Sequence, residues 1–347
     1  MNTIKNLSLV GRLTINLASL NNEGSEGNAT QPRSATIVQD GQLYSVPVIS
    51  GDMLKYWHTG HLARIAQDRG LPLGRNSNRR NLDPNRIKAE LNDLAWVSEH
   101  IPEAKGLKGK IEKLDRQPLE DALYREVARA CVVTDAHGSL ITEIAPKGEE
   151  DSFSASVAVA RTSRVQVGFM VGVPSKSATK HYFHAKFVST RTGQQAREGS
   201  SNEGQNIFTR PATSAEYAIV VNIDLAGLGF NDAQNIHVVS EEELAARKRA
   251  VIDALSFTLM NQPGANASQQ FPHIMDFSGA IVTSSNALPA PTVSPLKEDY
   301  LSVLESLIES ANSMNSDAAM ECKPVDSLSD AVSVLTSISA AFRLPSA

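Results

Sequence analysis

The stretch LSLVGRLTINL (residues 7–17) alternates between two kinds of position along its whole length. Every odd position from Leu7 to Leu17 is apolar or glycine, whereas most even positions are polar. A period of two over this length predicts a half-buried β-strand. Such a strand needs other elements of the chain to cover its apolar face.

Turn and capping residues define the elements that follow this strand. A polar loop (21–34) leads to two strand-like runs around Asp40 and Gly41, a dipeptide typical of tight hairpins. Ser50 then offers the N-cap of a helix that ends near Gly70.

Beyond that helix, a charged segment of helical character precedes further strands. Residues 73–130 are charged and helical in character, so we expect an inserted helical subdomain. Strand-like runs resume at 156–173 and 216–225, and a capping box opens a helix at Ser240 that runs to about Met260.

The C-terminal part contains a last strand (280–285), a proline-rich linker and two helical patterns, 297–312 and 326–342. The order of strands and helices predicts an α+β fold with an antiparallel sheet and insertions. A ferredoxin-like βαββαβ core fits that order.

Composition excludes several classes of protein. With 41% hydrophobic and 20% charged residues among 347, the chain is typical of a globular protein. Cys131 and Cys322 lie far apart without CxxC spacing, so neither a disulfide framework nor a zinc site is expected. No stretch resembles a signal peptide or the roughly 20 apolar residues of a membrane span, so we expect a cytoplasmic protein without membrane contact.

Basic charge is concentrated in one part of an otherwise acidic chain. Residues 152–215 hold eight Lys and Arg against two Glu, a local net charge of +6 in a chain whose net charge is −5. This segment is either a polyanion-binding finger or a solvated loop, and charge alone does not decide between them.

Motifs for catalysis are absent. No P-loop, GxGxxG, HExxH or GxSxG pattern occurs, so we expect no catalytic residues, no bound metal and no cofactor. His58 and His61 have no third ligand nearby, which favours surface or interface histidines over metal ligands.

Within the basic segment, two clusters suit nucleic acid. Arg161 and Arg164 flank two hydroxyl residues, a pattern that suits phosphate oxygens, although charges at a strand end facing water are the alternative. Residues 180–186 interleave cations with aromatic rings, which can hold a backbone and stack bases, or the rings can anchor a core.

Five stretches in this order resemble the crRNA-binding backbone subunits of type I CRISPR effector complexes, the "Cas seven" group in its DevR-type branch. They are LTINLASLNNEGSEGNATQPR (13–33), YSVPVISGDML (44–54), RTSRVQVGFMV (161–171), AEYAIVVNIDLAGLG (215–229) and NQPGANAS (261–268).

The resemblance implies an RRM-like palm with a helical fingers-like insertion and a protruding, hairpin-like thumb. The corresponding ranges are 1–72 and 131–288 for the palm, 73–130 for the insertion, 174–212 for the thumb and 289–347 for the linker and C-terminal helices. It also implies several copies of the chain packed along one crRNA guide, which pairs with target DNA, together with other CRISPR effector subunits.

The same resemblance implies RNA contacts for the residues that match its motifs, namely Arg33, Ser50, Gly51, Lys55, Arg161, Arg164, Gly264, Asn266 and Ser268. The thumb adds Lys180, Lys186 and Arg210 as RNA-binding candidates. Because the first strand lacks the aromatic residues of an ordinary RRM, we expect phosphate contacts to dominate.

Two other functions compete with this one. RNA-cleaving relatives use an Asp in the loop after the first strand, where this chain has only Glu23 and Glu26, which weakens the alternative of a metal-dependent endoribonuclease. The third hypothesis is a partner-binding protein whose basic loop is merely solvated.

Overall fold

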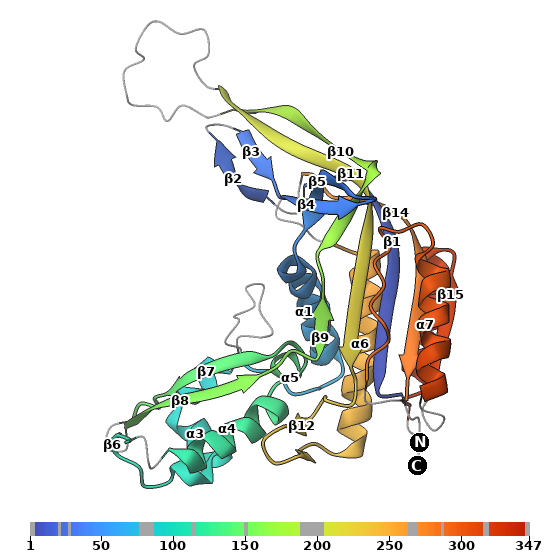
Figure 1. Ribbon diagram of the computed structural model, residues 1–347. Coiled ribbons are helices and arrows are strands. Elements are labelled where there is room, and N and C mark those ends of the chain that lie inside the picture. Colours follow the sequence, from blue (N-terminus) through green and yellow to red (C-terminus); the bar gives the residue numbers. More distant parts are fainter. Residues whose placement is uncertain are drawn as a thin grey trace, which may run out of the picture.

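The structure is a computed structural model, in which a central sheet carries two arms that extend toward the same side (Figure 1). It describes residues 4–19, 22–26, 29–75, 87–112, 116–148, 152–187, 205–262, 269–285, 288–314 and 319–343. One arm is a long β-hairpin, and the other combines short helices with a small sheet.

The main sheet is built around β1 (Asn6–Ala18), which pairs antiparallel with β11 (Gln205–Asp224) and β14 (His273–Ser284). Its strand order is β15-β14-β1-β11-β10-β5-β4, and β9 also pairs with β11. The remaining bounds are β4 (Ser34–Gln39), β5 (Gln42–Ile49), β9 (Val165–Val167), β10 (Met170–Phe187) and β15 (Met320–Val325).

Two helices complete a ferredoxin-like core. In chain order, β1, α1 (Gly51–Asp68), β9 with β10, β11, α6 (Glu241–Met260) and β14 make the βαββαβ pattern. The spatial order of these strands, β14-β1-β11-β10, is that of the same motif, so the predicted α+β class and core are confirmed.

Both faces of β1 are buried, so the prediction of a half-buried strand is wrong in that respect. Leu9 and Leu13 face the main core with α1, α6 and α8 (Leu328–Ala340), whereas Val10 packs in a second core with Leu304 of α7 (Tyr300–Met314). A helix almost 300 residues later covers the second face, which the pattern of the strand cannot show.

Gly11 is required by the packing of two strands. It faces Gly279 of β14, and a Cβ atom at Gly11 would lie 2.4 Å from the carbonyl oxygen of Ser278 and 2.5 Å from the ring of Phe277. The absence of a side chain therefore lets the buried ring lie across the strand.

The predicted hairpin and helix starts are confirmed. Asp40 and Gly41 both have positive φ (51° and 75°), as a two-residue hairpin turn requires. The side chains of Ser50 and Ser240 cap α1 and α6 by accepting hydrogen bonds from the backbone, at 3.3 Å from Met53 N and 3.2 Å from Glu243 N.

The insertion contains strands as well as the predicted helices. It contains α2 (Lys88–Leu91), α3 (Leu94–His100), the 3₁₀ turn η1 (Pro102–Ala104), α4 (Gln117–Arg129) and α5 (Val132–His137). A three-stranded sheet completes this arm, in the order β6 (Gly109–Lys110), β8 (Phe153–Arg161) and β7 (Ser139–Ile144). β7 and β8, which fall in the range that the resemblance implied for the palm (131–288), thus belong to the sheet of this arm.

The second arm is the predicted protruding hairpin. β10 and β11 stay paired from Ser177–Ala215 to Phe187–Gln205, beyond a register shift that follows Gly172. The short hairpin of β2 (Asn22–Glu26) and β3 (Ala29–Pro32) lies against it through β11. A smaller hairpin, β12 (Phe230–Asn231) with β13 (Ile236–His237), precedes α6.

Both C-terminal helices lie where the sequence placed them, but the strand between them was missed. β15 adds an edge to the main sheet by pairing with β14. Its sequence, MECKPV, carries two charges and a proline, which hide the strand pattern and also suit an edge strand. Within the described ranges, no helix is long and apolar enough to cross a membrane.

Candidate nucleic-acid interface

The start of α1 brings three of the candidate residues together. Ser50 is the buried N-cap, and Gly51 packs against the link between β9 and β10, where a Cβ atom would lie 3.0 Å from the carbonyl oxygen of Val167. Lys55 follows one turn later and is half-buried. The N–H groups at a helix start attract anions, but the exposed carboxylate of Asp52 in the first turn offsets that attraction here.

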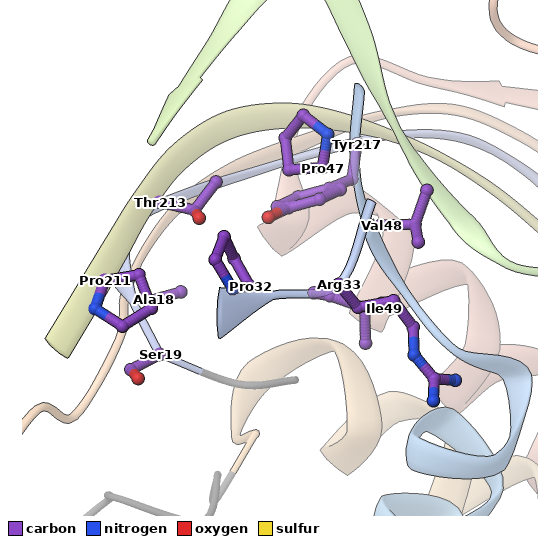
Figure 2. A pocket seen from close by; sticks show the side chains of 10 residues that line it. All are labelled: Ala18, Ser19, Pro32, Arg33, Pro47, Val48, Ile49, Pro211, Thr213 and Tyr217. Atoms are coloured by element: carbon purple, nitrogen blue, oxygen red, sulfur yellow. The ribbon is translucent and has the colours of Figure 1, made fainter. Parts of the chain in front are cut away.

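Arg33 lies beside this helix start, at a pocket between β1, β5 and β11. Figure 2 shows its guanidinium extending toward the beginning of α1. The pocket is lined by Ala18, Ser19, Pro32, Arg33, Pro47, Val48, Ile49, Pro211, Thr213 and Tyr217. Arg33, Ser50, Gly51 and Lys55 therefore share one region on the α1 side of the sheet.

The hairpin divides its candidate residues between two faces. Tyr182 pairs with Arg210, and Lys180 pairs with Ala212. The side chains of Lys180, Tyr182 and Arg210 therefore lie on one face. Phe183 lies on the other face, which it shares with Pro211 of the pocket, and is 83% exposed.

Lys180 is exposed and forms no ion pair within the described part of the chain. Arg210 donates a hydrogen bond to Gln269 at 2.8 Å. Lys186 lies on β10 opposite Asn206, and its side chain is outside the described residues. Gly264, Asn266 and Ser268 also lie outside the described residues, as do the side chains of Glu23 and Glu26 on β2.

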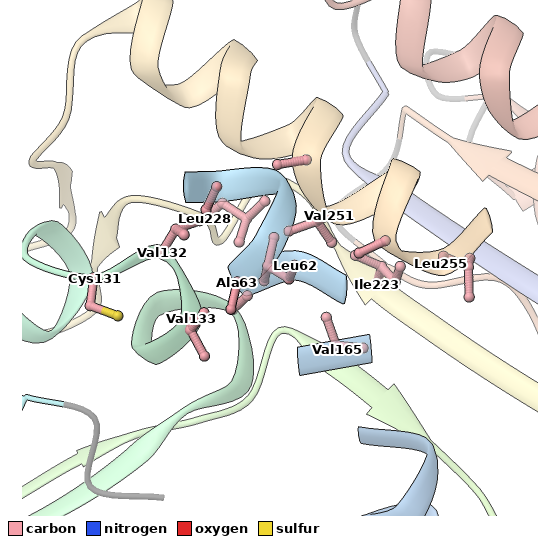
Figure 3. Close-up of a cluster of buried hydrophobic side chains, with 14 of the residues drawn as sticks. Leu62, Ala63, Cys131, Val132, Val133, Val165, Ile223, Leu228, Val251 and Leu255 are labelled. Atoms are coloured by element: carbon pink, nitrogen blue, oxygen red, sulfur yellow. The ribbon is translucent and has the colours of Figure 1, made fainter. Parts of the chain in front are cut away.

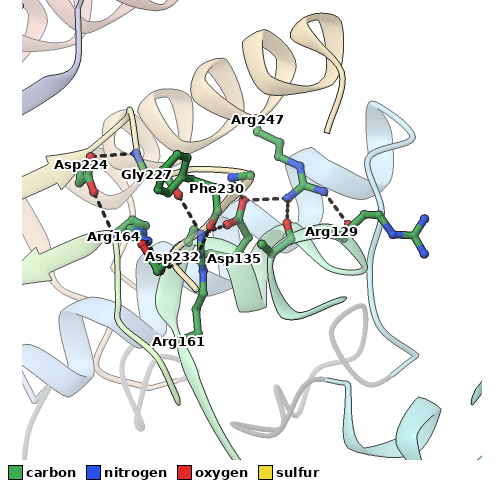
Figure 4. Close-up of polar contacts among 12 residues, drawn as sticks. Arg129, Asp135, Arg161, Arg164, Asp224, Gly227, Phe230, Asp232 and Arg247 are labelled. Carbon is green, nitrogen blue, oxygen red and sulfur yellow. Dashed lines mark hydrogen bonds and ion pairs between the residues drawn. The ribbon is translucent and has the colours of Figure 1, made fainter. Parts of the chain in front are cut away.

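Arg161 is not placed to contact a phosphate. Its buried guanidinium pairs with Asp135 and Asp232 and also donates to the carbonyl oxygens of Gly227 (2.8 Å) and Phe230 (2.5 Å) (Figure 4). Burial lowers the pKa of Arg161, and the Asp135 carboxylate opposes that shift. Since protein groups occupy its donors, the predicted phosphate role is not supported by this geometry.

Arg164 is engaged in the same region. Its guanidinium pairs with Asp224 at 3.2 Å and with Asp232 at 2.5 Å, and it is mostly buried. Both arginines of the RTSR stretch thus pair with carboxylates of the same chain, and they lie at the base of the helical arm rather than of the hairpin.

The network connects the helical arm to the palm. Asp135 of α5 accepts from Arg247 of α6 at 2.7 Å and from the backbone N–H of Gly229 at 2.8 Å, as well as from Arg161 of β8. Around it, Val132 and Val133 of α5 pack with apolar residues of α1, α6, β9 and β11 (Figure 3). Ion pairs and apolar contacts therefore both join the arm to the palm.

The two α1 histidines are buried rather than exposed at the surface. His58 Nδ1 lies 2.8 Å from His137 Nε2, and His58 Nε2 lies 3.1 Å from the carbonyl oxygen of Val251. His61 Nε2 lies 2.9 Å from the carbonyl oxygen of Asn261. Burial lowers the pKa of His58 to about 4, so this histidine is a neutral hydrogen-bonding group of the core at neutral pH.

Cations on the helical arm were missed by the sequence reading. Lys105, Lys108 and Lys110 are exposed around β6, on a segment (105–110) that contains no acidic residue. The sequence signal that could have found them is KGLKGK, which has three lysines in six residues.

The opposite face of the sheet is closed. Arg12 of β1 donates to the carbonyl oxygen of Pro295 at 2.7 Å and pairs with Glu298 at 3.1 Å, which holds the linker before α7 on the sheet. Tyr300 at the start of α7 lies against the Arg12 guanidinium. An RRM-like sheet offers this face to bases, whereas here α7 covers it.

Comparison with known proteins identifies the family. The family model described as CRISPR-associated negative auto-regulator DevR/Csa2 matches residues 9–305, and the chain belongs to this family.

Among its relatives, the CRISPR-associated protein Cas7/Cst2/DevR of Thermoproteus tenax is 25% identical over 92% of this chain and 91% of its own length. The CRISPR-associated aCascade subunit Cas7/Csa2 2 of Saccharolobus solfataricus is 27% identical over 79% of this chain and 78% of its own. A solved chain described as CRISPR RNA-guided surveillance complex, pre-nicking, covers 97% of this chain and 99% of its own with 11% identity and a TM-score of 0.42.

Proposed function

We propose that this protein is a non-catalytic subunit that binds crRNA and repeats along it, so that the guide is presented to target DNA. The proposal rests first on the family and on a relative named as an aCascade subunit. Its partners are then the guide, further copies of the chain, other CRISPR effector subunits and, by pairing through the guide, DNA.

One observation about surface charge carries the proposal. Exposed lysines lie on both arms, Lys180 on the hairpin and the group Lys105, Lys108 and Lys110 on the helical arm. Both arms extend toward the same side, while α7 closes the sheet face that other RRM-like domains use. A polyanion is therefore favoured along the arm-bearing side.

Phosphate contacts explain why such a surface needs no base-specific groups. A guide-binding subunit must accept any guide sequence, and lysines hold the backbone of a strand without reading its bases. The hairpin takes the part of the thumb in this proposal, and the helical arm takes that of the fingers.

The test measures RNA affinity as a function of salt. The variant Lys105→Glu/Lys110→Glu should bind guide RNA more weakly for every sequence, and the dependence of affinity on salt should become shallower by about 0.7 per lost phosphate contact. The matched control is Lys297→Glu/Lys323→Glu, which changes exposed lysines near α7 and β15.

Equal loss in both variants would contradict the proposed side, since it would indicate a general effect of net charge. Absence of RNA from protein produced together with a guide, by the ratio of absorbance at 260 and 280 nm, would contradict the function itself. Shortening of the RNA in the presence of a divalent metal would favour the endoribonuclease alternative.

A further inference from the structure

Phe169 is an exposed aromatic residue in a well-packed part of the fold. Its side chain is 52% exposed, although the next residue, Met170, is fully buried and Val167 packs against the main core. About half of this large apolar ring thus stays in contact with water, and covering it with a ligand would be favourable.

The backbone on both sides of Phe169 is held in place. The N–H of Gly168 donates to the carbonyl oxygen of Val220 at 3.2 Å, and Val167 pairs with Val221 in β11. On the other side, Met170 pairs with Ile49 of β5. The ring is therefore presented from a fixed strand connection, and ordering it for a ligand costs little conformational entropy.

The connection that carries Phe169 adjoins the start of α1, where several of the candidate RNA-binding residues lie. Its connection packs on the first residue of α1, where a Cβ atom at Gly51 would lie 3.5 Å from the carbonyl oxygen of Gly168. Val48 pairs with Val171 and donates its N–H to the carbonyl oxygen of Arg33 at 3.1 Å, which places Arg33 on the adjoining segment. The segment that carries Arg33 and the connection that carries Phe169 thus both adjoin the start of the same helix.

We propose that Phe169 is a stacking platform for one base of the single-stranded guide. The inference rests on the proposed function and adds to it a contact made with a base rather than a phosphate. Stacking uses the π-face that all four bases share, so it strengthens binding without selecting a sequence. It also places the base contact at the connection between β9 and β10, because α7 covers the face where an ordinary RRM stacks its bases.

The experiment compares two variants with two RNAs. Phe169→Ala and the control Phe271→Ala, whose ring is equally exposed (51%), are each titrated with a guide RNA and with the same RNA carrying abasic sites throughout the bound stretch. For Phe169→Ala we expect affinity for the intact RNA to fall about 5- to 150-fold, and affinity for the abasic RNA to stay unchanged. Phe271→Ala should leave both affinities unchanged, and Phe169→Trp should retain binding of the intact RNA.

The outcomes separate this inference from the proposed function. If the unaltered protein binds neither RNA, the proposed function fails. If it binds RNA and Phe169→Ala loses affinity for both RNAs equally or for neither, the stacking role is overturned and the proposed function stands. Weaker self-association of Phe169→Ala with unchanged RNA affinity, measured by sedimentation, overturns it in favour of a contact between protein copies.

Discussion

Replacing Arg161 by Met should destabilise the protein without removing a direct RNA contact. The substitution deletes a buried guanidinium that is bound by the carboxylates of Asp135 and Asp232 and by three carbonyl oxygens. Its shape is roughly kept by the methionine side chain, but the charge and all the donors are lost.

The magnitude follows from what is left behind. Loss of one partner from a buried ion pair costs about 3–5 kcal/mol of unfolding free energy, because the other charge stays uncompensated. Asp135 keeps Arg247 at 2.7 Å and the N–H of Gly229 at 2.8 Å, so we expect the lower end, about 3 kcal/mol. That is a large part of the about 5–15 kcal/mol that typically holds a domain together.

Two assays on the same variants separate the structural role from a phosphate contact. Urea unfolding gives the stability, and guide-RNA titration in the absence of urea gives the affinity of the folded protein. Asp135→Asn is the informative companion, since it removes negative charge from the same network. Arg64→Met, at an exposed arginine of α1, is the control and should change stability by less than about 0.5 kcal/mol.

If Arg161 is structural, Arg161→Met and Asp135→Asn both lose stability, and the folded fraction of each binds RNA with nearly unchanged affinity. An Arg161→Met protein as stable as the parent but weaker for all RNA sequences would refute this reasoning and restore the phosphate contact.

Three further perturbations test the fold. In the folded state His58 is protonated only near its pKa of about 4, whereas in the unfolded state it is protonated near 6.5. The free energy of unfolding should therefore fall by about 3 kcal/mol as the pH drops through this window. His58→Gln should flatten that pH dependence in urea unfolding, whereas His273→Gln, at an exposed histidine, should leave it unchanged. Leu304→Ala removes a fully buried side chain of α7 and should lower the free energy of unfolding, measured in urea, by about 2–5 kcal/mol. Leu307→Ala, at a 43% exposed position of the same helix, should lower it much less. Gly11→Ala forces a Cβ atom to 2.4 Å from a carbonyl oxygen of β14, so its loss of stability should reach or exceed the upper end of about 1–3 kcal/mol, and a thermal melt like that of the parent would contradict the close strand contact.

Local patterns predicted the core elements well because their signals are short-range. Alternation marks β1, the Asp40-Gly41 turn fixes the first hairpin, and serine caps mark the starts of α1 and α6. Each of these features is a property of fewer than about 20 consecutive residues, which is the range over which periodicity and capping act.

Features that depend on distant partners could not be predicted. Arg161 and Lys180 are both cations in the same basic segment, yet one meets Asp135 from α5 and the other faces water. Because both lie in that segment, the sequence predicted RNA binding for both of them. Only the three-dimensional arrangement shows that their surroundings differ. The second covered face of β1 escaped for the same reason, because α7 comes from the far end of the chain.

The boundary of the family match falls inside a helix, with a consequence for what counts as one domain here. The match ends at residue 305, whereas α7 continues to Met314, and β15 and α8 follow it. β15 is a strand of the main sheet, and Leu335 and Ile338 of α8 belong to the main core. The part of the chain that the family model matches is thus shorter than the part that packs into one core, and a chain cut at residue 305 would lose residues of that core.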